Sequence, residues 1–258
     1  MPKSVSRSTK PAAKSSTGYY RDDLAYIHNK GFGDFAAGAS HWLINLLRSH
    51  GFIDGLVIDL GCGSGILARE LSVANYGVLG CDISEAMIEM ARERVPRGEF
   101  QVRPLLRARL RPCIAVTAIG EVFNYLFDRR NTPDRLEEFF ARVHDVLRPG
   151  GLFVFDVATP GRVPEGHSRS FREGADWVCL FEAREDSDKR TITRRINTFR
   201  KVGQLYRRDS ETHRLRLFDR TELTKQLRGA GFKVSTVSDY GKTQFPPGYV
   251  GFVCEKKK

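Results

Sequence analysis

The chain has 258 residues, a formal net charge of +11 and five cysteines, and these values exclude several classes of protein. The length suits one α/β domain with an insertion, whose core can be large enough without disulfides. The cysteines are scattered and contain no Cys-x-x-Cys pair, which argues against a structural zinc site and favours a reducing cytoplasm. No apolar run approaches membrane-spanning length, so we expect a soluble, cytoplasmic protein without a membrane partner or a metal.

The positive charge is concentrated in three segments. Residues 1–18 carry +4, residues 184–216 carry +6 and residues 255–258 carry +2, which leaves the rest of the chain nearly neutral. The first segment is rich in Ser, Thr, Lys, Ala and Pro, so we interpret residues 1–18 as a disordered basic tail. Such segments could attract nucleic acid, although a solvated face is the more frequent reason for a run of charge.

Residues 19–51 form the next predicted unit, an N-terminal helical cap. Its first half, residues 19–35, is rich in Tyr and Phe. Trp42, Leu43, Leu46 and Leu47 then recur at the spacing of one helix face, and this amphipathic helix is expected to end near Gly51.

An apolar run, a glycine turn and a helix follow one another between residues 56 and 71. Residues 56–60 suit a central strand buried on both faces, and the three glycines of residues 61–65 permit close approach by a ligand. A second strand, residues 77–81, ends on Asp82, whose carboxylate can accept both hydroxyls of a ribose. The spacing Gly-x-Gly-x-Gly is neither the dinucleotide fingerprint nor a phosphate loop. The pattern therefore predicts a nucleotide-type site at the carboxyl edge of a parallel sheet.

Four stretches resemble the motifs of the class I S-adenosylmethionine-dependent methyltransferases. They are VIDLGCGSG at residues 57–65, CDISEAMIEMARER at 81–94, RPGG at 148–151 and LRGAGFKV at 227–234. The resemblance extends over roughly residues 50–158 and 218–254. It implies an α/β fold with a doubly wound, Rossmann-like seven-stranded sheet, and S-adenosyl-L-methionine as the co-substrate.

Helices and strands alternate up to residue 159, and the pattern then changes. Ser84 can cap a helix over residues 85–95, and Asp219 can cap another. Residues 160–216 have strand-like composition without a helical period, so we interpret them as an antiparallel β insertion after strand five that caps the substrate. The S-adenosylmethionine-binding domain then comprises residues 52–159 and 217–258. Further strands are predicted at residues 100–102, 114–119, 152–157, 177–183, 191–199, 205–218, 234–237 and 249–254, and a further helix at residues 134–147, stopping at the RPGG motif.

The resemblance implies which residues bind the co-substrate. Glycines of the first motif would let the methionine portion approach the backbone, Asp59 would fix the loop and meet the ammonium, and Asp82 would hold the ribose. The residues after Asp82 would flank the adenine, and the end of strand four would lie beside the methyl group. The implied set is Asp59, Gly61, Cys62, Gly63, Gly65, Asp82, Ile83, Met87, Leu105, Ile119, Gly120 and Glu121.

Two positions depart from the family pattern. Residues 102–107, just beyond strand three, contain no carboxylate for the adenine amine, although the backbone N–H of Leu105 could still meet an adenine nitrogen. Strand four begins near Ile114, where the family usually carries an Asp. These departures leave a non-catalytic S-adenosylmethionine-binding protein open as an alternative.

The acceptor is less well defined than the co-substrate. We expect methyl transfer to N or O of a small-molecule acceptor by in-line displacement, which depends on alignment more than on a strong base. The candidate catalytic residues are Glu121, Asn124, Tyr125 and His213. His213 is either an exposed strand histidine or shares an inner face with Leu215 and Leu217. A nucleic-acid methyltransferase recruited by the basic tail and insertion is a second alternative.

Overall fold

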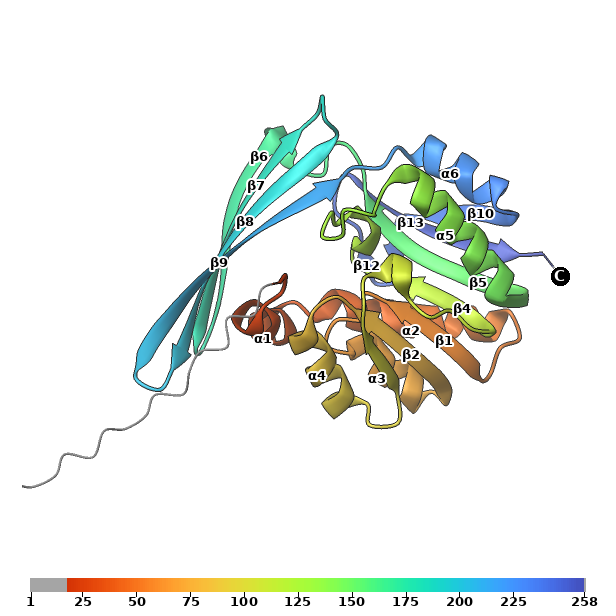
Figure 1. Cartoon of the computed structure of the whole chain (residues 1–258), viewed down its shortest axis with the longest axis horizontal. Coiled ribbons are helices and arrows are strands. Elements are labelled where there is room, and N and C mark those ends of the chain that lie inside the picture. The colour runs from red at the N-terminus through yellow and green to blue at the C-terminus, as the bar shows by residue number, and fades with distance from the viewer. Residues whose placement is uncertain (1–17, 258) are drawn as a thin grey trace, which may run out of the picture.

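The computed structural model describes residues 18–257, and a seven-stranded sheet lies at its centre (Figure 1). The strand order is β10-β13-β5-β4-β1-β2-β3, and β13 alone runs antiparallel to its neighbours. This is the predicted Rossmann-like methyltransferase sheet. Its strands are β1 (Gly55–Leu60), β2 (Tyr76–Asp82), β3 (Glu99–Val102), β4 (Cys113–Ala118), β5 (Leu147–Ala158), β10 (Phe232–Val237) and β13 (Tyr249–Lys256).

Helices cover both faces of this sheet. Apolar side chains of α2 (Asp34–Ser49), α3 (Ile66–Val73) and α4 (Glu85–Arg94) pack on one face. Those of α5 (Pro133–Val146) and α6 (Arg220–Gly229) pack on the other. Two of these helices begin as predicted, because Ser84 accepts the N–H of Met87 and Asp219 accepts the N–H of Thr221.

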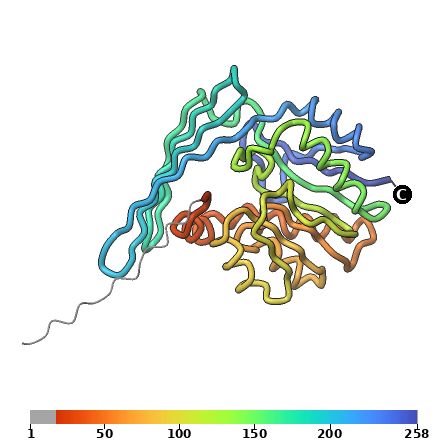
Figure 2. The backbone as a smooth tube through the Cα atoms, viewed as in Figure 1, coloured from red at the N-terminus to blue at the C-terminus, as the bar shows by residue number. Residues whose placement is uncertain are grey.

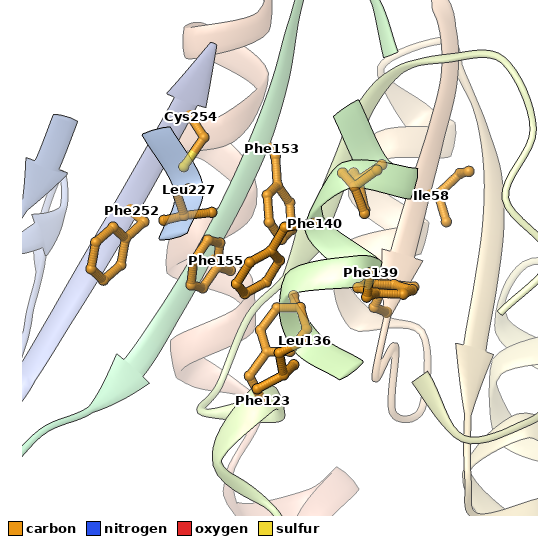
Figure 3. Packing of buried hydrophobic residues seen from close by; sticks show 14 of the residues in the cluster. Ile58, Phe123, Leu136, Phe139, Phe140, Phe153, Phe155, Leu227, Phe252 and Cys254 are labelled. Atoms are coloured by element: carbon orange, nitrogen blue, oxygen red, sulfur yellow. The ribbon is translucent and has the colours of Figure 1, made fainter. Parts of the chain in front are cut away.

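Alternation of side chains along the strands divides the interior into two cores. On β1, Ile58 lies in the core under α5 and α6, and Val57 lies in the core under α2, α3 and α4. The first core is rich in phenylalanine (Figure 3), with ring centroids of Phe123 and Phe155 5.2 Å apart. Because both faces are buried, the central strands β1, β4 and β5 are mostly apolar, which is the pattern seen in residues 56–60.

A second, antiparallel sheet follows β5 in the sequence and projects away from the main sheet (Figures 1 and 2). We call it the insertion sheet, and its order is β6-β7-β8-β9. Helix α1 (Asp22–Gly31) packs on the side that faces the main sheet, where Leu24 and Ile27 meet Trp177 and Ile196. We call this side the inner face. The strands are β6 (His167–Gly174), β7 (Trp177–Asp186), β8 (Thr191–Val202) and β9 (Leu205–Arg216).

Several predicted boundaries were wrong. Strand β6 was missed because it is mostly polar and solvent-exposed, with Phe171 its one large apolar side chain. The RPGG motif does stop α5, but it lies inside β5 rather than before it, and the register of β4 against β5 shifts there. The third insertion strand ends at Arg216, two residues early. The short hairpin of β11 (Asp239–Tyr240) and β12 (Thr243–Gln244) was also not predicted. Residues 1–17 of the predicted tail lie outside the described residues.

Candidate functional site

The glycine turn between β1 and α3 adopts a backbone that other residues rarely reach. Gly61 has φ +66°, and a Cβ there would lie 2.5 Å from the side chain of Val122, so both conformation and space require glycine. Gly63 has φ +51°, and a Cβ there would reach only the sulfur of Met87, at 4.0 Å. The turn is therefore tightly packed at Gly61 and open at Gly63, as a turn that receives a ligand must be.

Asp82 lies beside this turn at the end of β2. Its carboxylate accepts the backbone N–H of Gly63 at 3.0 Å and that of Ser84 at 2.9 Å. Burial raises the pKa of Asp82 above its ordinary value, although both N–H groups oppose the increase. The structure thus gives Asp82 a second task that the sequence did not reveal, which is to hold the glycine turn against α4.

Asp59 is buried at the end of β1 and is only half satisfied. One oxygen accepts a hydrogen bond from the hydroxyl of Thr117 at 2.9 Å, while Oδ2 has no partner among residues 18–257. Burial raises the pKa of Asp59 to about 7. An unpaired buried carboxylate oxygen is costly unless a ligand completes it, so Asp59 fits a binding partner with a cationic N–H group.

The remaining predicted co-substrate residues line the same edge of the sheet. Met87 is buried on α4, and Ile83 lies between Asp82 and the helix cap. Leu105 begins a short 3₁₀ helix, η1 (Leu105–Arg107), just beyond β3. Cys62 is buried, and its N–H donates to the carbonyl of Cys81. The carboxyl ends of β1, β2 and β3 therefore bring these residues together.

The loop after β4 is held by a carboxylate that the sequence analysis did not select. Asp156 on β5 accepts the N–H of Gly120 at 2.9 Å and that of Glu121 at 2.6 Å. The hydroxyls of Tyr240 and Tyr249 also donate to it, and burial raises its pKa to about 6. A lone Asp within an apolar strand was the available signal. Asp156 fixes the loop that carries Ile119, Gly120 and Glu121.

Glu121 points toward the insertion rather than standing free. It has φ +61°, is 5% exposed, and pairs with Arg162 at 2.8 Å and with Arg194 of β8 at 2.7 Å. Burial would raise the pKa of Glu121, but the guanidinium groups of Arg194 and Arg162 outweigh it and hold the pKa below its ordinary value. A carboxylate so stabilised in its ionised form is a weak base.

Both the nitrogen and the oxygen of the Asn124 side-chain amide form hydrogen bonds. Its nitrogen donates to the carbonyls of Ala158 and Arg216, and its oxygen accepts the N–H of Ala158. These bonds join the loop after β4 to the ends of β5 and β9, so the geometry favours a structural role for this candidate.

Tyr125 and His213 lie close together between the two sheets. The hydroxyl of Tyr125 is 3.0 Å from that of Tyr20 and 3.4 Å from a nitrogen of Arg194. His213 is fully buried, so its interpretation as an exposed strand histidine was wrong. Its ring centroid is 5.8 Å from that of Tyr125, and its Nε2 is 2.8 Å from Glu211.

We call Tyr20, Tyr125, Arg194, Glu211 and His213 the buried polar cluster. Glu211 and His213 are buried, and the other three members are half-buried. Sequence reasoning found two of its members and missed the other three. Strand alternation placed Leu215 and Leu217 on the side of His213, and both are buried. The same alternation places Glu211 there, which was the signal available for it.

No helix within residues 18–257 is long and apolar enough to cross a membrane. The same residues contain no group of three or more His, Cys, Asp or Glu side chains placed to hold a metal ion.

Comparison with known proteins gives consistent matches. A family model described as a methyltransferase domain matches residues 57–151. The putative methyltransferase YqeM of Bacillus subtilis is 28% identical over 200 residues, which cover 74% of this chain and 78% of that protein. The dTDP-3-amino-3,4,6-trideoxy-alpha-D-glucopyranose N,N-dimethyltransferase of Streptomyces venezuelae is 28% identical over 228 residues, which cover 82% of this chain and 88% of that protein.

A solved structure extends the likeness to the fold. SAM-bound CalS10, an amino pentose methyltransferase from Micromonospora echinaspora, aligns with a TM-score of 0.73 at 18% identity and covers 91% of this chain and 97% of that one. With the glycine turn and the sheet order, these matches identify residues 57–151 as a methyltransferase domain, carried on the fold of the class I S-adenosylmethionine-dependent methyltransferases, with S-adenosylmethionine as the co-substrate.

Proposed function

We propose that this protein transfers a methyl group to an amine nitrogen of a small, sugar-like acceptor. The Streptomyces venezuelae relative is by name an amino-sugar N,N-dimethyltransferase, and its alignment covers 82% of this chain. The alignment spans most of both chains, which supports an acceptor of similar size. The proposal has two parts, the placement of the co-substrate and the choice of nitrogen.

The co-substrate would lie along the carboxyl edge of β1, β2 and β4. When bound, it supplies a methyl group on a cationic sulfur. A lone pair of the acceptor can bond to the methyl carbon in line with the carbon–sulfur bond, which breaks as the sulfur leaves. The unpaired oxygen of Asp59 would accept its ammonium, Gly63 would lie under its methionine portion, and Asp82 would hold its ribose. Ile83, Met87 and Leu105 would enclose its adenine.

The choice of nitrogen over oxygen rests on one observation, the double ion pair of Glu121. A hydroxyl acceptor needs a general base within hydrogen-bond reach, because alcohols hold their proton strongly at neutral pH. We expect Glu121 to be the carboxylate beside the methyl group, but Arg162 and Arg194 hold it as a weak base. A neutral amine already carries a free lone pair and needs alignment instead. Burial raises the pKa of Tyr125, so its hydroxyl stays protonated and can position such an amine by hydrogen bonds.

The direct test is radiolabelled methyl transfer from S-adenosylmethionine to matched pairs of acceptors. Each pair contains a 3-amino sugar and the same sugar with a 3-hydroxyl, as the free sugar and as the dTDP-linked sugar. We expect label in the amino member of a pair and none in its hydroxyl partner. Label in the hydroxyl member would contradict the choice of nitrogen. Tight binding of S-adenosylhomocysteine without any transfer would support the non-catalytic alternative.

One observation favours a second candidate, a nucleic-acid methyltransferase. The outer face of the insertion sheet, opposite α1, exposes Arg195, Arg208 and Arg214 beside the exposed aromatic rings of Phe171 and Tyr206. Basic side chains attract phosphates, and aromatic rings can stack on unpaired bases. Binding of a fluorescent single-stranded RNA at physiological salt, lost in an Arg195→Glu, Arg208→Glu variant, would support this candidate over a small-molecule acceptor.

A further inference from the structure

Tyr20, just before helix α1, has an unusual backbone conformation. Its φ is +51°, a left-handed region that a bulky aromatic residue rarely occupies. Such a conformation persists only when surrounding contacts over-determine it, and it is found most often at functional sites. Four contacts of Tyr20 meet this requirement, and they come from strand β9 of the insertion sheet and from the loops after β2 and β4.

The main-chain groups of Tyr20 are held from opposite sides. Its N–H donates to Glu211 of the insertion sheet at 2.8 Å, and its carbonyl accepts the hydroxyl of Ser84 at 2.7 Å. Ser84 is tied in turn to Asp82, the predicted ribose ligand. Tyr20 therefore lies directly between the expected co-substrate site and the insertion.

The side chain of Tyr20 completes the buried polar cluster. Its hydroxyl is 3.0 Å from that of Tyr125, and its ring centroid is 5.0 Å from that of His213. Burial and the neighbouring Tyr125 raise the pKa of Tyr20 well above its ordinary value, so this hydroxyl is a neutral hydrogen-bonding group.

Glu211 is the group that fixes this arrangement. It is 6% exposed, and its second oxygen accepts the N–H of Arg21 at 2.8 Å. His213 adds a third contact through Nε2. A buried carboxylate that receives two consecutive backbone N–H groups and an imidazole determines where the chain at residues 20–21 must lie.

We propose that Glu211 is a positioning residue for acceptor methylation, which docks residues 20–21 so that the hydroxyl of Tyr20 reaches Tyr125 and completes the acceptor site. The inference rests on the proposed function, because it assumes that the acceptor lies beside the Tyr20–Tyr125 pair. Glu211 acts through Tyr20 and does not touch the reacting atoms. Acceptor use therefore depends on Glu211, and co-substrate affinity does not.

The chain offers a matched control for this proposal. Asp209 lies two residues away on the same inner face and also pairs with the N-terminal segment, at 2.6 Å from Arg21. The two side chains of that pair are about one-quarter to one-third exposed, so solvent screens this pair more than it screens the contacts of the buried Glu211. Glu211→Gln weakens the buried anchor, whereas Asp209→Asn weakens only the partly exposed pair.

The first experiment compares kinetics of the two variants on the dTDP-linked 3-amino sugar used above. Glu211→Gln should lower kcat/KM for this acceptor by about 10- to 100-fold, because misplacing the positioning hydroxyl loses alignment. Its affinity for S-adenosylmethionine, measured by calorimetry, should stay within about threefold, and Asp209→Asn should resemble the wild type on both measures. Normal acceptor turnover by Glu211→Gln would overturn the proposal. A merely structural role would lower acceptor kcat/KM and S-adenosylmethionine affinity together.

The second experiment guards against a Glu211 variant that fails to fold. Tyr20→Phe removes only the hydroxyl group and should lower acceptor kcat/KM on its own. Combined with Glu211→Gln, it should add little further loss, because both changes act on the same hydroxyl. Fully additive losses, or an unaffected Tyr20→Phe variant, would contradict the proposed route through Tyr20.

A third readout does not depend on the acceptor. With S-adenosylhomocysteine bound, hydrogen exchange at residues 20–31 should be faster in Glu211→Gln than in Asp209→Asn or the wild type. If the wild type methylates no amino sugar, the proposed function fails while this experiment still tests the docking. Unchanged exchange in Glu211→Gln would overturn the docking role itself.

Discussion

Four carboxylates at the carboxyl edge of the sheet are each held differently, and this determines what each can do. Asp156 is saturated by backbone and tyrosine donors, and Glu121 is paired with two arginines. Asp82 braces the glycine turn, and Asp59 retains an unpaired oxygen. The first two therefore organise the loop after β4, while the last two remain available to a ligand.

At this scale we predict that Asp82→Ala weakens binding of S-adenosylmethionine by about tenfold or more. Each charge-assisted hydrogen bond lost contributes about 1.5–3 kcal/mol, and the turn at Gly63 also loses its acceptor. Calorimetry on a variant whose circular dichroism is unchanged provides the measurement, with exposed Glu85→Gln as the control. Equal affinities of the two variants would exclude the ribose role.

The raised pKa of Asp59 predicts a pH dependence of stability. Its pKa is about 7 in the folded chain against 3.8 ordinarily, so the fold favours the protonated form. This contribution is fully present below about pH 4 and is lost as the pH rises through 7. The free energy of unfolding of the wild type should therefore fall relative to Asp59→Asn between pH 5 and 8, by a few kcal/mol, on the order of the shift itself. The free energies come from denaturant titrations at each pH. If those of the wild type and of Asp59→Asn change in parallel with pH, Asp59 does not have a raised pKa.

At the scale of elements, alternation along β9 separates the roles of adjacent residues. His213 is fully buried on the inner face, and Arg214 is exposed on the outer one. His213→Ala should cost about 1–3 kcal/mol of stability, because it leaves the buried Glu211 without one donor, and should lower acceptor turnover. Arg214→Ala should change stability by less than about 0.5 kcal/mol. Chemical denaturation and methyl transfer on both variants provide the comparison, and equal effects would contradict the assigned faces.

At the scale of the whole molecule, the N-terminal segment contacts both the insertion sheet and the carboxyl edge of the main sheet, and so adds to direct contacts such as the pair of Arg194 with Glu121 (Figure 1). Asp23 of α1 pairs with Arg200 and Arg207 of the insertion, which adds to the anchor at Glu211. Deleting residues 1–17 should leave melting temperature, S-adenosylmethionine affinity and acceptor turnover nearly unchanged, because their composition offers no core contact. Deleting residues 1–21 should reduce acceptor turnover strongly while co-substrate affinity stays similar. Equal turnover by the two truncated chains would show that residues 18–21 are dispensable.

The co-substrate half of the site could be predicted from the sequence because its residues are local. Gly61, Gly63 and Gly65 lie within five positions, and Asp82 ends the next strand. Parallel strands place their carboxyl ends at one edge, so a strand, a glycine turn and a second strand already define a site. Apolar runs likewise predicted most strands of the main sheet, and helix caps predicted the starts of α4 and α6.

The proposed acceptor half of the site depends on contacts between segments that are far apart in the sequence. Glu211 and Tyr20 are 191 positions apart, and Glu121 and Arg194 belong to different sheets. No local pattern specifies which strand face an inserted sheet turns toward its domain, or that polar residues on that face will be buried. His213 shows the difference: its sequence neighbours are compatible with exposure or burial, and it is buried because rings from two distant segments pack around it, namely Tyr19, Tyr20, Tyr125 and Phe127. The sequence by itself therefore indicated the methyl donor, because the motifs for it are local, whereas the proposed acceptor site is formed by packing between distant segments.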